Sequence, residues 1–129
     1  MSTRIVPITV VSALLTFAVY FILALLRNGG VLEHAVDDVY IHLAMAEQLF
    51  AGGYGVNADE FSSAASSPLY PLLLPTWAGL GVQRWLPIFW NVLWLGMAAW
   101  LLGIALDRAR LGRAGYVIAV VAPLALSMP

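Results

Sequence analysis

Two long apolar runs flank one polar segment, and this alternation sets the expected architecture. Residues 5–26 and 85–106 are dominated by apolar side chains. Each run exceeds the roughly 20 residues that an α-helix needs to cross a hydrocarbon layer of about 30 Å. A third apolar run, 114–129, is shorter and stops at the last residue of the sequence. The pattern predicts an all-α integral membrane protein, with transmembrane helices at 5–26 and 85–106 and an apparently truncated one at 114–129.

The first half of the polar segment has the periodicity of an amphipathic helix. Residues 38–51 place most apolar side chains in one broad sector that includes Met45 and Phe50, with Glu47 on the opposite side. Such a helix is expected to lie flat at the membrane surface. An aspartate at its start suits an N-cap, and the glycines that follow Phe50 tolerate the positive φ that often ends a helix.

The second half of the polar segment ends in residues 68–81, which are apolar but too short to span. As a helix they would rise only about 21 Å, and Pro71 and Pro75 would disturb the hydrogen-bond ladder. We expect a juxtamembrane or re-entrant helix that starts at Ser67-Pro68, because serine caps free N–H groups and proline fits the first turn.

Arginine positions predict the orientation. Three arginines lie close together at Arg108, Arg110 and Arg113, so the loop 107–113 is expected in the cytoplasm by the positive-inside rule. The polar segment 28–84 then becomes an exoplasmic loop of a multi-pass plasma-membrane protein. A cleaved signal peptide is the competing interpretation of the first run, but its apolar region would span about 7–15 residues and a small-residue cleavage site would follow.

Composition narrows the function classes. The chain is 62% hydrophobic and only 10% charged, which is typical of a membrane protein rather than a soluble domain. It contains no cysteine, so disulfides and thiolate metal sites are excluded. All acidic residues except Asp107 lie within 28–67, where no Lys or Arg occurs. The loop therefore presents an acidic surface, and nucleic acid is not an expected partner.

The adjacent carboxylates Asp37 and Asp38 are the strongest candidates for chemistry, and each feature near them has a plainer alternative. The pair can serve only as a helix cap and as charges favoured by the helix dipole. Asp38 and His42 are four residues apart and therefore neighbours on a helix, within its apolar sector. His42 can be a packing residue satisfied by Asp38, or a ligand with Asp37 and Asp38 for a divalent metal ion. His34 is expected to be a solvated loop residue.

The order of the short motifs resembles the amino-terminal part of GT-C glycosyltransferases, the polytopic enzymes that use polyprenyl-phosphate sugars. The motifs follow one outward span and are, in order, Asp37-Asp38-x-Tyr40-Ile41-His42, Gly53-Tyr54-Gly55-Val56-Asn57 and Ser66-Ser67-Pro68-Leu69-Tyr70. The likeness is greatest to bacterial arabinofuranosyl- and mannosyltransferases. In such families the first exoplasmic loop begins with a catalytic acidic residue, which by position is Asp37, with Asp38 as its neighbour. The resemblance implies a polyprenyl-phosphate sugar donor and a glycan or lipid acceptor. It also implies that this chain alone is an inactive amino-terminal module.

The chemistry of such a transfer adds further candidates. A base must deprotonate the acceptor hydroxyl, and Asp37 is expected to be that base, while Asp38 orients His42 or helps to hold a divalent cation. The donor phosphate needs positive charge, for which Arg84 is a candidate at membrane level. The other expected substrate contacts are Tyr40, His42 and Tyr54.

Two non-enzymatic classes remain open. A small membrane scaffold or assembly subunit would use the same helices without any chemistry, and its function would survive replacement of Asp37. A transporter fragment would carry charged or histidine side chains inside a span, yet the runs 5–26 and 85–106 contain no Asp, Glu, Lys, Arg or His. That absence counts against transport.

Overall fold

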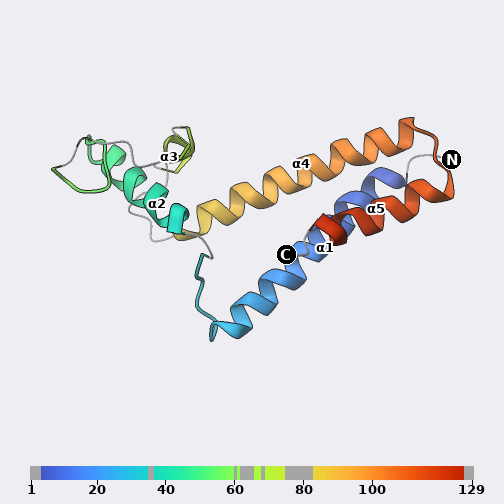
Figure 1. Cartoon of the computed structure of the whole chain (residues 1–129), viewed down its shortest axis with the longest axis horizontal. Coiled ribbons are helices and arrows are strands. Elements are labelled where there is room, and N and C mark those ends of the chain that lie inside the picture. Colours follow the sequence, from blue (N-terminus) through green and yellow to red (C-terminus); the bar gives the residue numbers. More distant parts are fainter. Residues whose placement is uncertain are drawn as a thin grey trace. The chain divides into compact units, whose positions relative to one another are not determined.

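The computed structural model describes residues 4–34, 37–59, 61, 66–67, 69–74 and 83–126, and this part of the chain is helical and free of strands. The all-α class is therefore confirmed. Figure 1 shows the helices, which are α1 Ile5–Arg27, α2 Asp37–Phe50, α3 Tyr70–Leu73, the short 3-10 helix η2 Gln83–Trp85, α4 Leu86–Arg108 and α5 Arg113–Leu126.

The chain divides into two compact units. One consists of Met1–Leu32 with Trp90–Pro129 and is called the long-helix unit; the other is Glu33–Phe89 and is called the polar unit. The long-helix unit holds α1, most of α4, and α5. The polar unit holds α2, α3, η2 and the first turn of α4.

The two longest helices form where the sequence pattern predicts them. Both α1 and α4 contain 23 residues and are long and apolar enough to cross a membrane. Only 17% of the most apolar stretch of α1 and 11% of that of α4 is buried within the protein. Each helix ends on an arginine, Arg27 and Arg108. Most of their apolar surface therefore has no covering from the described protein itself.

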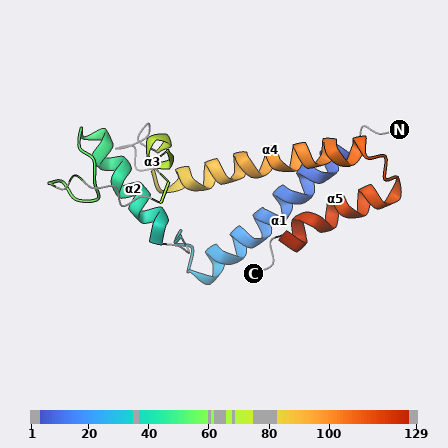
Figure 2. The ribbon, with the colours of Figure 1, turned by 45° about the horizontal axis from the view of Figure 1, so that its top comes forward.

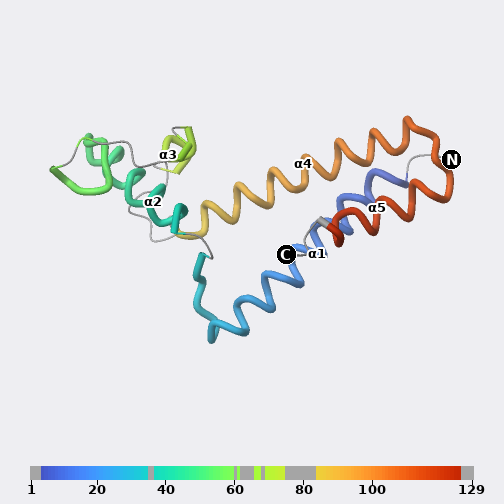
Figure 3. Tube along the Cα trace, in the orientation of Figure 1, coloured from blue at the N-terminus to red at the C-terminus, as the bar shows by residue number. Residues whose placement is uncertain are grey.

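The core of the long-helix unit lies where the three helices meet. Ile5 of α1, Leu106 of α4 and Ala119 of α5 are buried together, and Ile8 and Leu102 pack against them. The trace turns back after α4, and α5 returns along α1 (Figure 3). This arrangement buries one end of α1 and leaves most of its length exposed.

Small and hydroxyl-bearing residues allow these helices to approach closely. A Cβ atom added to Gly103 of α4 would lie 2.7 Å from the Cα atom of Val6 on α1. The hydroxyl of Ser12 donates to the carbonyl of Val120 on α5 at 3.2 Å, and Thr9 donates back to the Ile5 carbonyl at 2.9 Å. Close packing of small residues and hydrogen bonds between helices are typical of association in lipid.

The connection from α4 to α5 is a tight turn. Arg110 has φ +52° and Gly112 has φ +55°, and the Arg110 N–H donates to the Asp107 carbonyl at 3.2 Å. The predicted loop 107–113 is therefore shortened, because α4 continues to Arg108 and α5 already begins at Arg113. The last three residues of the predicted third span lie outside the described residues.

In the polar unit, α2 begins and ends close to the predicted bounds. Asp37 is already the first residue of the helix rather than its N-cap, so the predicted cap is wrong by one position. Both aspartates lie in the first turn, where the helix dipole favours negative charge. Gly52 adopts φ +87° after its last residue, and the Gly53 N–H donates to the Gln48 carbonyl at 2.8 Å. This bond satisfies a carbonyl that the helix end would otherwise leave unpaired.

The second predicted loop helix is short within the described residues. α3 covers only Tyr70–Leu73 and starts two residues later than predicted, with Leu69 rather than Ser67 as its N-cap. Pro71 fits this first turn because its missing N–H has no helical acceptor there. The remainder of the predicted helix, residues 75–81, lies outside the described residues.

Candidate functional site

The candidate site is built on the contact between α2 and α3, which lie side by side in Figures 1 and 2. Met45 and Ala46 of α2 and Leu74 after α3 are fully buried. The apolar side of α2 thus packs in part against protein. Phe50, which the periodicity places in the same sector, is instead 66% exposed because it ends the helix beside exposed residues.

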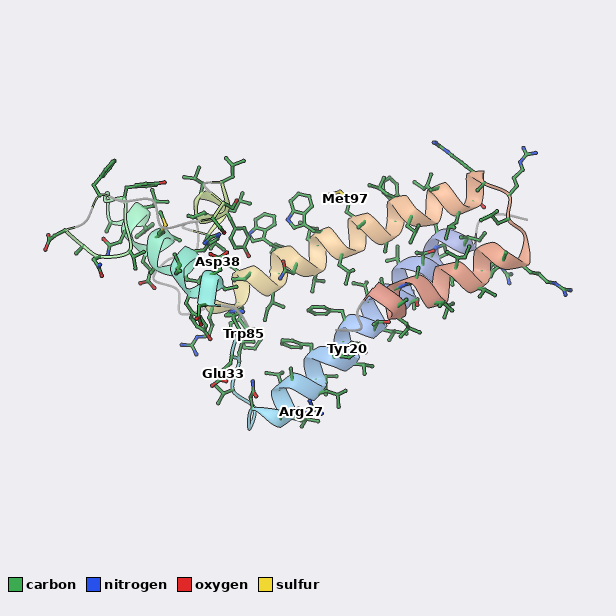
Figure 4. The ribbon with its side chains drawn as sticks, in the orientation of Figure 1. Tyr20, Arg27, Glu33, Asp38, Trp85 and Met97 are labelled. Carbon is green, nitrogen blue, oxygen red and sulfur yellow. The ribbon has the colours of Figure 1, made fainter. Side chains whose placement is uncertain are left out.

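Asp38 joins two segments that are far apart in the sequence. The Ser66 hydroxyl donates to its Oδ2 atom at 2.7 Å, and the same oxygen lies 3.9 Å from Nε2 of His42. Asp38 projects from the first turn of α2 (Figure 4). A hydrogen bond from a hydroxyl to a carboxylate is charge-assisted and therefore stronger than a neutral one. Asp38 is thus held in place by Ser66, whereas the His42 nitrogen lies beyond hydrogen-bonding distance.

His42 is the buried member of this group. It is 3% exposed, and its ring centroid lies 5.1 Å from that of Tyr70 on α3, with the planes tilted by 55°. Its Nδ1 atom is buried without a hydrogen-bond partner among the described residues. Burial raises the pKa of the Tyr70 phenol above its ordinary value of 10.0, so this neighbour stays neutral in ordinary buffers.

Asp37 is placed differently from its neighbour. Its side chain is exposed at the start of α2. In the part of the chain that the structure describes, no hydrogen bond or ion pair engages its carboxylate. Two adjacent carboxylates thus occupy two environments, since Asp38 is bound to Ser66 and Asp37 faces solvent.

Tyr40 and Arg84 are both linked to His34. The His34 N–H donates to the Tyr40 hydroxyl at 3.0 Å, and its Nε2 atom lies 3.1 Å from the Arg84 carbonyl. The His34 and Tyr40 rings meet edge to face, with centroids 5.6 Å apart. His34 thus ties the start of the polar unit to η2 and to α2, whereas the sequence pattern indicated only a solvated loop residue.

Tyr54 is not brought to the acidic pair. It follows the end of α2 opposite to Asp38, and that helix, with its 14 residues, is about 21 Å long. The Tyr54 ring instead lies 5.4 Å from that of Phe61. Its assignment as a sugar contact stays a prediction and requires an acceptor long enough to reach both ends of α2.

The expected metal site lacks ligands in the described part of the chain. No group of three His, Asp or Glu side chains is placed there to hold a metal ion. Asp38, His42 and Ser66 come together, but hydroxyl oxygen is a weak third ligand beside one carboxylate and one imidazole.

Two residues of the site were missed from the sequence. Ser66 had a signal, because it belongs to the Ser66-Ser67-Pro68-Leu69-Tyr70 motif that resembles the GT-C family, but the motif gave it no partner. His34 had no such signal in the sequence. A single histidine in a loop gives no indication that its backbone and its ring contact two other segments. Such contacts depend on how the loop folds back on itself.

An apolar groove lies in the long-helix unit, separate from these polar residues in the sequence. Its volume is about 740 Å³, and it is lined along α1 from Pro7 to Leu23 and closed on one side by Val120 and Leu124 of α5. The Ser12 and Thr16 hydroxyls in its wall already donate to backbone carbonyls. The groove is therefore suited to an apolar chain.

Comparisons with protein-family models, with curated proteins and with solved structures found no match to this chain.

Proposed function

We propose that the chain is the amino-terminal module of a membrane glycosyltransferase that moves a sugar from a polyprenyl phosphate to an exoplasmic glycan or lipid. One observation carries the proposal: the two motifs on which the family resemblance rests most are in contact. Ser66 of the third motif bonds to Asp38 of the first, and Tyr70 of the third motif lies against His42 of the first. Residues that act on one substrate must be gathered in this way.

Asp37 is the general base of the proposed reaction. Its exposed carboxylate accepts the proton of the acceptor hydroxyl as that oxygen attacks the anomeric carbon of the donor sugar. The bond from the anomeric carbon to the phosphate oxygen breaks, and its electron pair leaves with the polyprenyl phosphate. Asp38, bonded to Ser66, cannot serve equally well, because one of its oxygens already accepts a hydrogen bond.

In the proposed reaction, the polyprenyl-phosphate sugar donor reaches the protein from the lipid bilayer. The low burial of α1 and α4 leaves apolar surface that a bilayer would cover, which supports their assignment as spans. The groove beside α1 gives an apolar path for a prenyl chain. The exposed Arg108, Arg110 and Arg113 support a cytoplasmic turn between α4 and α5, so the polar unit faces the exoplasm.

The test is sugar transfer by membranes that carry the chain within its natural protein or with its natural partners. Asp37→Asn keeps the size of the side chain and removes the base, so we expect a loss of about 10²–10⁴-fold in the transfer rate. Asp59→Asn is the matched control, because Asp59 is an exposed aspartate of the same loop. Full activity of the Asp37→Asn variant would leave a scaffold or assembly subunit as the better interpretation.

A further inference from the structure

We propose that His34 is a positioning residue that holds Tyr40 and Arg84 together as a pair of hydrogen-bond donors for oxygen atoms of the substrate. The role of this pair in sugar transfer rests on the proposed function, whereas the positioning itself does not. His34 is the second residue of the polar unit, and Arg84 lies near the end of the same unit. The contact between them therefore joins the places where the chain enters and leaves the polar unit.

Two hydrogen bonds of ordinary length fix His34. Its backbone N–H donates to the Tyr40 hydroxyl at 3.0 Å, and its ring Nε2 atom lies 3.1 Å from the Arg84 carbonyl oxygen. Both separations lie within the usual range of N–H···O bonds. The ring also meets that of Tyr40 edge to face, with the planes 73° apart. The sequence neighbours Glu33 and Trp85 lie close together as a result (Figure 4).

The Arg84 carbonyl determines which nitrogen of the imidazole carries hydrogen. A carbonyl oxygen only accepts hydrogen bonds, so Nε2 of His34 is the donor. The neutral ring then has no hydrogen on Nδ1. Because the protonated ring also carries hydrogen on Nε2, this bond does not depend on the charge of the imidazole.

These contacts leave the donor groups of Tyr40 and Arg84 available. The Tyr40 hydroxyl accepts the His34 N–H, and its own hydrogen has no acceptor among the described residues. Tyr40 is 46% exposed. Arg84 is held through its backbone, and its exposed guanidinium makes no ion pair with the residues that the structure describes. Phenol and guanidinium can therefore both donate to sugar or phosphate oxygens.

The first experiment measures hydrogen exchange of the His34 backbone amide by NMR, in the full chain in detergent micelles. Tyr40→Phe removes the acceptor of that amide, so we expect its exchange to rise about two- to tenfold. Tyr54→Phe is the matched control, because it removes a tyrosine hydroxyl beyond the far end of α2, and it should leave the His34 amide at the wild-type rate. Unchanged exchange in Tyr40→Phe would overturn the proposal.

The imidazole nitrogens of His34 provide an independent measurement on the wild-type chain at alkaline pH. Nitrogen shifts distinguish the two neutral tautomers, and the resonances that disappear in His34→Gln belong to His34. We expect hydrogen on Nε2. Hydrogen on Nδ1 would overturn the proposal, whatever the protein's activity.

The second experiment separates positioning from a purely structural role by sugar-transfer kinetics. His34→Gln retains an N–H donor near the place of Nε2, whereas His34→Leu has similar bulk and no donor. We expect His34→Leu to raise KM about two- to tenfold with kcat near the wild-type value, and His34→Gln to keep both values. Equal KM in the two variants would contradict the proposal. Inactivity of the wild type would refute the proposed function and leave the exchange and tautomer results to decide the positioning.

Discussion

The Ser66 hydroxyl donates a 2.7 Å hydrogen bond to Oδ2 of Asp38, across 28 positions of the sequence. This bond joins the loop before α3 to the first turn of α2. It also makes the two adjacent aspartates unequal, because Asp38 is engaged and Asp37 is not. The difference is the basis for assigning the base to Asp37.

The bond between Ser66 and Asp38 can be measured by a double-mutant cycle. Ser66→Ala and Asp38→Ala each remove one partner, and the site is partly exposed, so we expect each to reduce the local stability of the loop by about 1 kcal/mol or less. The double variant should cost no more than either single one. Hydrogen exchange over residues 66–74 provides the measurement, and simple additivity of the two effects would show that the bond contributes nothing.

We predict that a single methyl group added at Gly103 would force α1 and α4 apart. Its added Cβ would lie 2.7 Å from the backbone of Val6, which cannot move without shifting the helix, so Gly103→Ala should destabilise the long-helix unit by about 1–3 kcal/mol. Gly96→Ala on the same helix is the control, since nothing lies within 4 Å of its added Cβ. Thermal unfolding in detergent compares the two, and an unchanged midpoint for Gly103→Ala would refute the close approach.

Tyr70 is expected to resist ionisation. Burial raises the pKa of its phenol above 10.0 in the folded state, so the folded protein retains a proton that the unfolded chain releases. The stability that this proton confers is fully present below pH 10.0 and falls as the pH rises above it. The tyrosinate absorbance of the wild type and of Tyr70→Phe is compared at pH 10.0. The absorbance lost in the variant should be smaller than that of free tyrosine at the same concentration. An equal decrease would place Tyr70 in open solvent.

The predicted orientation can be tested with single cysteines, because the chain has none of its own. Asp59→Cys in the polar unit and Arg110→Cys in the turn after α4 both replace exposed residues. A membrane-impermeant maleimide added to intact cells should label the first and leave the second unlabelled until the cells are permeabilised. The reverse pattern would place the polar unit in the cytoplasm, where the proposed exoplasmic transfer could not occur.

The helices were predictable because their signals are local. A run such as 5–26 or 85–106 shows its length and composition directly, and Gly52 marks the end of α2 through its own backbone freedom. The acidic pair could also be placed in a first turn from residue type alone. Spacing along α2 further predicted that Asp38 and His42 would be neighbours, and the structure confirms this.

The remaining contacts were not predictable because they join segments that are distant in the sequence. Nothing in the spacing of Ser66, His34 or Tyr70 indicates which part of α2 each one meets. Tyr54 illustrates the opposite case, since it belongs to one of the motifs yet lies beyond the far end of α2. Motifs that follow one another in the sequence are therefore not all close together in the fold.

The most direct test of the proposed function is the co-product of the reaction. Each sugar transferred should release one polyprenyl phosphate, which mass spectrometry can quantify together with the glycosylated acceptor. Membranes with the wild-type chain should produce both in equal amounts, and membranes with Asp37→Asn should produce neither above background. Equal release of polyprenyl phosphate and product by the Asp37→Asn variant would contradict the assignment of Asp37 as the base.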